Sequence, residues 1–280
     1  MLTKQEVIDY YEQCEIDYRL VWDLKKSMAM HYGYWDKTTK TFHQALNRTN
    51  EVLAKRVNLK KTDRVLDAGC GVGGSSIYLA KKYGCKVVGI TLVGKQVKTA
   101  EQNAKKHGVE KLATFKKRDY SKTGFSRGAF DVVLGIESVG HAGDKKAFLK
   151  EAHRLLRNKG RLGIIDSFLT ERKLTDRETK LIQKLAKAWV APSLLKAESF
   201  RQDMKTVGFK KIKIKDETTH IMPLALRMYA AFFLGFVVSK VLEIFKPRTT
   251  IQRGNLWSAY YQYPIYKNRL LKYCIVTAEK

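Results

Sequence analysis

From residue 64 to residue 167 the chain alternates short β-rich runs with helical stretches. It opens with RVLDAG, SSIYLAKKY and KVVGITL and continues through KQVKTAEQNAKKHG, ATFKKRD, FDVVLGIES, DKKAFLKEAHRLLR and RLGIIDS. Strands that alternate with helices form parallel βαβ units, in which helices cover both faces of the sheet. The pattern therefore predicts an α/β fold with a doubly wound, mostly parallel sheet.

Helical patterns flank this segment on both sides. Before it, apolar side chains recur every three or four residues from about residue 7 to residue 59, interrupted by the aromatic stretch MHYGYWD. After it come two helical stretches, the strand KKIKIKDET, an apolar helical region over 224–245 and the closing strand LLKYCIVTAE. We expect a single domain over residues 1–280: an N-terminal helical cap (1–59), a ligand-binding core (60–168), and a last part with helical lid insertions, the substrate region and the closing strands (169–280).

The composition is strongly basic. Lys and Arg number 54 against 27 for Asp and Glu, which gives a formal charge of +27. Such a surface attracts polyanions, so nucleic acid, an anionic membrane and a phosphorylated substrate stay open as partners, as does a basic surface with no specific partner.

The four cysteines, Cys14, Cys70, Cys85 and Cys274, show no paired C-x-x-C spacing. We expect reduced thiols and no metal site. The N-terminal sequence MLTKQEVIDYYEQCEIDYRL is acidic and aromatic, whereas a signal peptide has a basic start and an apolar run. These observations predict a cytoplasmic protein.

The segment 222–245, MPLALRMYAAFFLGFVVSKVLEIF, is too apolar for an ordinary surface helix. Its longest apolar run, 228–239, is bounded by Arg227 and Lys240 and is shorter than the roughly 20 residues that span a bilayer, so we expect no transmembrane helix. Two interpretations stay open. The segment is either a core helix packed on the sheet, or a lid that lines a lipid pocket and contacts the surface of an anionic membrane.

A glycine-rich turn follows the first β-rich run, in the sequence VLDAGCGVGG. Asp67, Gly69, Gly71 and Gly73 stand where a strand ends and a helix opens. Glycine allows the backbone to turn sharply there and to approach a ligand closely, so the turn predicts a nucleotide-type crevice, with packing as the alternative use.

This stretch, L-D-x-G-C-G-x-G-G, resembles the first motif of class I S-adenosylmethionine-dependent methyltransferases, which implies a Rossmann-like fold and S-adenosylmethionine as the cofactor. The resemblance continues at the second strand. Thr91, Leu92 and Gln96 match the variant of cyclopropane fatty acid synthases, tocopherol methyltransferases and sterol methyltransferases, with Val93 in place of a serine. A hydroxyl and an amide would then contact the ribose or the methionine, where other members use a carboxylate.

Further cofactor-binding residues are implied by the same resemblance. Asp119 and Tyr120 match an acid–aromatic pair that holds the adenine, and Ile136 ends the fourth strand beside it. Upstream, HYGYW is similar to a loop that lipid-methylating relatives place over the cofactor, which implies Tyr32 and Tyr34; an aromatic contact between helix and core is the alternative.

The candidate catalytic residues follow the fourth strand, in the sequence GIESVGHAGD. Glu137 and His141 lie at the carboxyl edge of the sheet, where open α/β sheets hold ligands. Methyl transfer is an in-line displacement that needs alignment and proton removal, and a carboxylate and an imidazole serve both needs. Cyclopropane synthases carry a Glu directly before the His, where this chain has Gly140, whereas Glu137, His141, Ala142 and Asp144 match the sterol methyltransferase pattern.

We therefore expect methylation, at carbon, of a hydrophobic lipid-type substrate such as a sterol, a prenyl quinone or tocopherol-like ring, or an unsaturated acyl chain. The alternative is N- or O-methylation of a small soluble amine or acid, since fold does not fix substrate. Nucleic-acid methylation is the weakest of the three, because the segment after the fourth strand lacks the Asn/Asp-Pro-Pro-aromatic turn that clamps a base.

Overall fold

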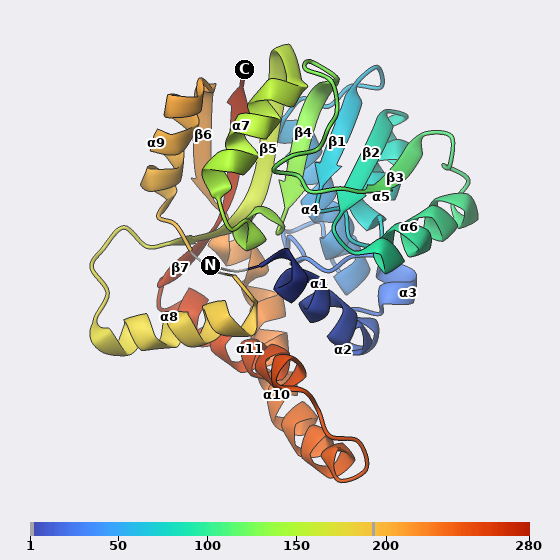
Figure 1. Ribbon diagram of the computed structural model, residues 1–280. Coiled ribbons are helices and arrows are strands. Elements are labelled where there is room, and N and C mark those ends of the chain that lie inside the picture. Colours follow the sequence, from blue (N-terminus) through green and yellow to red (C-terminus); the bar gives the residue numbers. More distant parts are fainter. Residues whose placement is uncertain (1–2, 192–193) are drawn as a thin grey trace.

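The computed structural model describes residues 3–191 and 194–280, and a seven-stranded sheet forms the centre of this part of the chain (Figure 1). The strands are β1 (Arg64–Ala68), β2 (Lys86–Thr91), β3 (Ala113–Lys117), β4 (Phe130–Ile136), β5 (Leu156–Leu169), β6 (Lys210–Asp216) and β7 (Leu271–Glu279). Their order across the sheet is β3-β2-β1-β4-β5-β7-β6. The first five are parallel, and β7 runs antiparallel between β5 and β6. The predicted α/β fold is confirmed.

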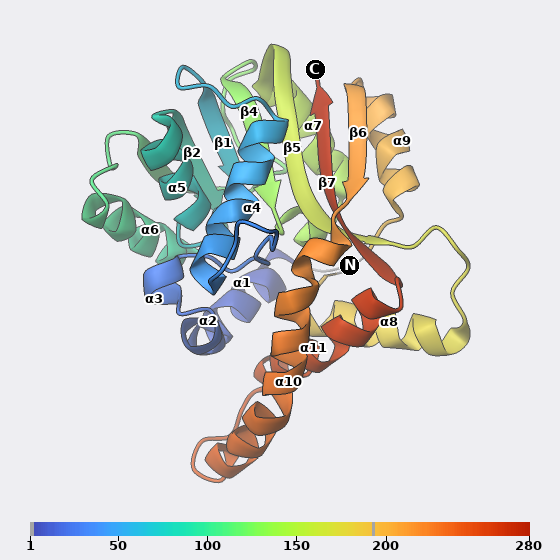
Figure 2. The ribbon, with the colours of Figure 1, turned by 180° about the vertical axis from the view of Figure 1, so that it is seen from behind.

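Helices cover both faces of the sheet. Those that follow or precede the parallel strands are α4 (Phe42–Arg56), α5 (Gly74–Tyr83), α6 (Gly94–Lys106), α7 (Lys145–Leu155) and α9 (Ala197–Val207). Side chains of α4 and α5 pack on the face that carries Val65, and those of α7 and α9 pack on the face that carries Leu66 (Figure 2). Each face buries its own apolar cluster because alternate residues of a strand point to opposite sides.

The remaining helices gather at the carboxyl ends of the parallel strands, below the sheet in Figure 1. The N-terminal part forms α1 (Lys4–Gln13), α2 (Glu15–Val21) and α3 (Leu24–Ser27), and a single 3-10 turn, η1 (Val139–His141), follows β4. From the second half come α8 (Asp176–Ala188), α10 (Thr218–Glu243) and α11 (Thr250–Lys267).

Helices α10 and α11 form a hairpin that projects away from the sheet (Figures 1 and 2). The first half of α10 is buried through Ile221, Leu224 and Ala225, but the second half exposes most of its apolar side chains. The interpretation of this segment as a core helix packed on the sheet therefore holds only for its beginning. Within the described residues, Thr218–Val241 is long and apolar enough to cross a membrane by length and composition, and 28% of its most apolar window is buried.

The sequence pattern predicts no helix between residue 245 and the closing strand, whereas the structure has α11 there, with Gly254 and Pro264 inside it. A capping box starts this helix: the Thr249 side chain accepts from the Gln252 N–H, and the Gln252 side chain accepts from the Thr249 N–H. Contacts with α8 and α10 then hold it along its length. Tertiary packing here outweighs two residues of poor helix propensity.

All four cysteines are buried and unpaired.

Candidate active site

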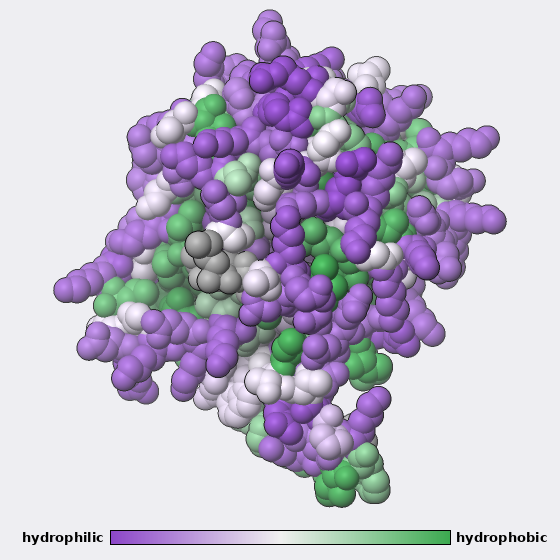
Figure 3. Space-filling view, viewed as in Figure 1, coloured by the Kyte–Doolittle hydropathy of each residue, from purple (hydrophilic) through white to green (hydrophobic). Residues whose placement is uncertain are grey.

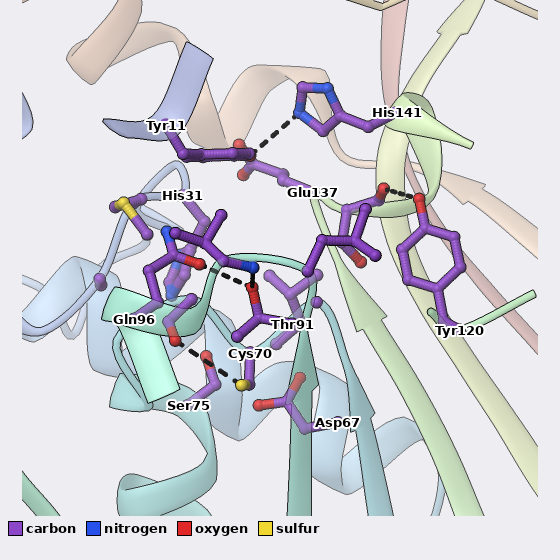
Figure 4. A pocket seen from close by; sticks show the side chains of 18 of the residues that line it. Tyr11, His31, Asp67, Cys70, Ser75, Thr91, Gln96, Tyr120, Glu137 and His141 are labelled. Carbon is purple, nitrogen blue, oxygen red and sulfur yellow. Dashed lines mark hydrogen bonds between the residues drawn. The ribbon is translucent and has the colours of Figure 1, made fainter. Parts of the chain in front are cut away.

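A cavity lies where β1, β2 and β4 end, and α1 and the loop after α3 form its opposite wall (Figure 4). We call it the central cavity. Ten of the expected site residues line it: Asp67, Gly69, Gly71, Thr91, Leu92, Gln96, Tyr120, Ile136, Glu137 and His141. The other four, Tyr32, Tyr34, Gly73 and Asp119, are not part of its wall.

The glycine turn has the backbone that its sequence requires. Gly69 and Gly71 have φ values of +93° and +52°, in the left-handed region that side chains disfavour. A Cβ on Gly71 would lie 2.6 Å from the Cε atom of Met30, which also lines the cavity, so the absence of a side chain lets Met30 approach the turn closely. Gly73 is placed differently, because a Cβ there would lie 2.8 Å from the Phe115 ring inside the core. It therefore allows packing of α5 against β3.

Polar side chains supply the walls beside this turn. Asp67 is buried and accepts a hydrogen bond of 2.6 Å from the Ser76 hydroxyl. Burial raises the pKa of this carboxyl to about 6. At the end of β2, the Thr91 hydroxyl donates to the Gln96 side-chain oxygen at 2.7 Å, which fixes the orientation of the Gln96 amide.

The two residues of the acid–aromatic pair after β3, Asp119 and Tyr120, have different surroundings. Tyr120 lines the cavity, and its hydroxyl donates to the Ser138 carbonyl oxygen at 3.0 Å. Asp119 instead forms an ion pair of 2.6 Å with Lys4 of α1 and accepts from the Ser121 N–H. Its carboxylate thus fastens the N-terminal helix to the core.

The two tyrosines of the HYGYW loop point away from the central cavity. The Tyr32 hydroxyl donates to Gln262 of α11. Tyr34 is buried, its hydroxyl donates to Glu217 at 2.9 Å, and its ring stacks on His220 with centroids 4.0 Å apart. In this structure, therefore, neither hydroxyl is presented to the position expected for the cofactor.

Glu137 lies at the junction of the central cavity with two neighbouring cavities. One of its oxygens, Oε1, accepts from the Tyr32 N–H and from the Tyr273 hydroxyl, both at 2.6 Å. Burial raises the pKa of this carboxyl to about 8. A group with such a pKa exchanges protons near neutral pH, as a general base requires.

His141 faces Glu137 across the cavity and is held from two sides (Figure 4). Its Nδ1 atom lies 3.2 Å from the Val190 carbonyl oxygen, which can only accept a hydrogen bond. Nδ1 therefore donates, and Nε2 accepts from the Tyr11 hydroxyl at 3.0 Å. Burial lowers the pKa of His141, which favours this neutral form.

Several residues at the site were not expected from the sequence. Tyr11, Met30, His31 and Ser75 line the central cavity. Asp166 lies in β5 beside Glu137, just beyond the level at which the neighbouring strand β4 ends. The rule that strand ends hold ligands would have found Asp166. Tyr11 comes from α1 and gave no signal, since its contact with His141 joins residues 130 positions apart.

A second cavity opens beside Glu137, between α2, α10 and α11. We call it the apolar cavity. Its walls are mostly aliphatic or aromatic, with Leu20, Val21, Trp22, Met228, Phe232 and Leu256 among the residues that line it. The only cation of its described wall is Arg248, whose guanidinium pairs with Asp17 at 2.5 Å.

The central cavity fits S-adenosylmethionine on three observations. A side chain at Gly71 would reduce the space beside the turn, the Gln96 amide can contact hydroxyl groups, and Asp67 can accept from an amino group. The apolar cavity adjoins the central cavity at Glu137. Among the described residues, no group of three or more His, Cys, Asp or Glu is placed to hold a metal ion.

Comparison with known proteins agrees with this geometry. The chain is 28% identical over 278 residues to ajmaline N-methyltransferase of Rauvolfia serpentina, covering 93% of this chain and 94% of the relative. It is 28% identical over 211 residues to sterol 24-C-methyltransferase of Clavispora lusitaniae, covering 74% and 56%.

Among solved structures, the cyclopropane synthase MmaA2 from Mycobacterium tuberculosis superposes with a TM-score of 0.84 at 15% identity, covering 99% of this chain and 98% of that one. Other structures of this fold contain S-adenosylmethionine or S-adenosylhomocysteine. The model of the mycolic acid cyclopropane synthetase family matches residues 3–233. The chain therefore belongs to the mycolic acid cyclopropane synthetase family of S-adenosylmethionine-dependent methyltransferases.

Proposed function

We propose that the enzyme methylates a hydrophobic, lipid-type acceptor such as a sterol, a prenyl quinone or tocopherol-like ring, or an unsaturated acyl chain. The observation that carries this proposal is the apolar cavity, which adjoins the central cavity at Glu137. A water-insoluble acceptor gains by leaving water for such walls, at about 25 cal/mol per Å² of apolar surface. Family members named for a sterol and for cyclopropane synthesis support the same class of substrate.

We assign the catalytic roles to Glu137 and His141. The cofactor contacts are assigned to the other eight expected residues that line the central cavity: Asp67, Gly69, Gly71, Thr91, Leu92, Gln96, Tyr120 and Ile136. S-adenosylmethionine supplies an activated methyl group when bound. Glu137 accepts a proton from the acceptor or steadies positive charge beside it, and the two hydrogen bonds on its Oε1 atom hold it in place. His141 and Tyr11 order the opposite wall.

The methylated atom has two candidates. The motif shared with sterol methyltransferases, with Glu137, His141, Ala142 and Asp144 in matching places, favours carbon. The named activity of the ajmaline relative favours nitrogen.

We further propose that the α10–α11 hairpin contacts an anionic membrane on the cytoplasmic side. Figure 3 shows hydrophobic residues at the far end of the hairpin, at the bottom of the view. Ile244 and Phe245 are 77% and 82% exposed there, next to Lys246. Exposed apolar side chains beside lysines bind anionic leaflets, and each lysine or arginine near the surface contributes roughly 1 kcal/mol.

The whole chain, 1–280, would act as one methyltransferase domain, with no nucleic acid as partner.

A labelling experiment tests the substrate class. The protein is incubated with S-adenosylmethionine that carries a labelled methyl group, in parallel with a lipid extract and with a mixture of small soluble amines and acids. We expect label in the lipid fraction, with a product that chromatography can identify. Label confined to the soluble mixture would overturn the lipid proposal.

A further inference from the structure

A third cavity lies between the central cavity and the apolar cavity and shares Glu137 with both. We call it the tyrosine chamber. Four tyrosines, Tyr10, Tyr11, Tyr18 and Tyr32, form much of its wall, together with Trp189. The tyrosines are ordered by mutual contacts: the Tyr10 and Tyr11 rings meet edge to face with centroids 5.2 Å apart, and the hydroxyls of Tyr10 and Tyr18 are 3.0 Å apart.

Two carboxylates complete this aromatic wall. Asp166 is 9% exposed; its oxygens accept from the Gly140 N–H at 2.7 Å and from the Ser167 N–H at 2.8 Å. Glu137 is close enough for the charge of Asp166 to raise the Glu137 pKa. Both hydrogen bonds found for Glu137 within the described residues fall on Oε1, which leaves Oε2 without a protein donor there.

The chamber is acidic in a chain of opposite charge. The full sequence has 54 Lys and Arg, yet neither type occurs among the described residues that line the chamber or the central cavity. An anionic ligand would meet two acidic side chains there, because Lys145, the cation next to them, does not line the chamber and donates to the Gly140 and Ala142 carbonyl oxygens. A positively charged group would meet these two acidic side chains, whose ionised form a nearby cation favours, and the π faces of aromatic rings, which recognise alkylammonium groups.

We propose that the tyrosine chamber binds the nitrogen of a hydrophobic amine, and that this nitrogen is the methyl acceptor. The inference rests on the proposed methyl transfer to a hydrophobic acceptor and narrows its substrate class to an apolar body that carries a basic nitrogen. The body lies in the apolar cavity, while the nitrogen meets Glu137 at the place where all three cavities join.

The chemistry balances without another reactant. The lone pair of the neutral amine forms the new N–C bond as the S–C bond breaks, and the electron pair of that bond stays on sulfur. Positive charge thus moves from the sulfonium to the nitrogen. A tertiary amine ends as a quaternary ammonium, and a secondary amine then gives its proton to the Glu137 carboxylate or to water.

Binding to the protein saturated with S-adenosylhomocysteine tests the charge preference. The probes are benzyltrimethylammonium and its uncharged carbon isostere, neopentylbenzene, measured by calorimetry or by Trp fluorescence. We expect the ammonium to bind about tenfold more tightly than the isostere. The same protein should transfer labelled methyl to dimethylbenzylamine, with benzyltrimethylammonium as the product.

Matched variants test which residues cause the preference for the ammonium probe. Asp166→Asn and Tyr18→Leu should each reduce the preference for the ammonium several-fold, while binding of neopentylbenzene and of S-adenosylhomocysteine persists and reports an intact fold. Asp203→Asn makes the same chemical change in a carboxylate on α9 that pairs with Lys146, and should leave the preference unchanged.

Equal binding of both probes would overturn the inference. Tight ammonium binding without methylation of the amine would also overturn it. The chamber would then stabilise the positive charge that develops on the acceptor during methylation of carbon. Neither result touches the proposed function, which fails separately if no hydrophobic fraction is labelled.

Discussion

The backbone of Glu137 is left-handed, with φ at +49°, directly after β4 ends. Non-glycine residues adopt this conformation at a cost of order 1 kcal/mol or more, and they do so mainly where surrounding contacts fix them. Here the Glu137 N–H donates to the Ile165 carbonyl oxygen at 2.8 Å, while its side chain is held by Tyr32 and Tyr273. The turn thus directs a buried carboxylate toward the junction of the three cavities.

The raised pKa of Glu137 predicts a dependence of stability on pH. The folded protein keeps a proton on this carboxyl up to about pH 8, whereas the ordinary value of 4.5 applies when the chain unfolds. The folded state therefore binds more protons between these values, and stability falls as pH rises through them. Urea unfolding should show the wild type losing on the order of 2 kcal/mol more than Glu137→Gln between about pH 6 and about pH 9. Parallel losses in both proteins would assign the titration to another group.

Asp119 offers a test of how the cofactor and α1 share one carboxylate. If Asp119 accepts from the adenine, as the family resemblance implies, Asp119→Asn should weaken S-adenosylmethionine binding by about 1–3 kcal/mol. Lys4→Met removes the ion pair that now occupies this carboxylate and should leave the affinity within about threefold, since exposed ion pairs contribute little. Calorimetry measures the affinity of both variants for S-adenosylmethionine and so distinguishes the two roles of Asp119. An equal loss in both would mean that Asp119 acts only by fastening α1.

Residues of the site could be predicted from the sequence where one short motif supplies them. Asp67, Gly69 and Gly71 follow one strand, and all three line the central cavity. The position of Tyr34 could not be predicted in this way, because its hydroxyl donates to Glu217, which lies 183 residues later in the sequence. No local pattern encodes such a partner, and the same holds for Tyr11.

At the scale of helices and strands, the alternating sequence pattern was sufficient to predict the sheet, but it did not predict the hairpin. The parallel strands β1, β2 and β4 are runs of β-rich residues that are buried on both faces. Helix α10 begins at Thr218 and contains Pro223 in its first turns, so it starts earlier than the expected 224. Pro223 lies beyond the first turn and removes one hydrogen bond of the helix, a loss that the burial of Ile221, Leu224 and Ala225 outweighs.

Gly254 gives a prediction about the hairpin. It lies inside α11, and a Cβ there would lie 3.6 Å from the Cα atom of Ala188, the last residue of α8, which is a normal contact. Gly254→Ala should therefore raise the free energy of unfolding by about 0.5–1 kcal/mol, through better helix propensity. Gly163→Ala is the contrasting variant, because its Cβ would lie 2.7 Å from Val57 in the core. Denaturation curves that rank the two variants in the opposite order would contradict this account of the packing.

The exposed end of the hairpin predicts membrane binding. Ile244→Ser with Phe245→Ser should reduce co-sedimentation with anionic vesicles several-fold, because these side chains supply the apolar contact. Wild-type binding should be stronger to anionic than to neutral vesicles and should weaken with salt. Phe232 is unsuitable for this test, since it is 6% exposed and packs against Trp257.

A control keeps this membrane prediction specific. Ile16→Ser changes another exposed apolar side chain, 46% exposed on α2, and should leave vesicle binding unchanged. Equal loss in the control and in the double variant would mean that general surface hydrophobicity, rather than the hairpin, drives binding.

At the scale of the whole molecule, the reaction site is built from parts that are far apart in sequence. The core strands supply Asp67, Thr91 and Glu137, α1 supplies Tyr11, and the hairpin closes the apolar cavity. Asp17 of α2 ties two of these parts together, because it accepts from both Arg248 and Asn255 near the start of α11. The cap and the hairpin would therefore enclose the proposed acceptor jointly, while the ends of the core strands line the central cavity.

The most direct test of this account is calorimetric binding of S-adenosylmethionine to the wild type and to Gly71→Val. Valine would be strained at φ +52° and would fill the space beside the turn. Gly108→Val controls for the strain alone, since Gly108 has φ +67° and open space around a Cβ. The account predicts binding in the wild type and in Gly108→Val, and a loss of more than about tenfold in a folded Gly71→Val protein. Wild-type affinity in folded Gly71→Val would contradict it.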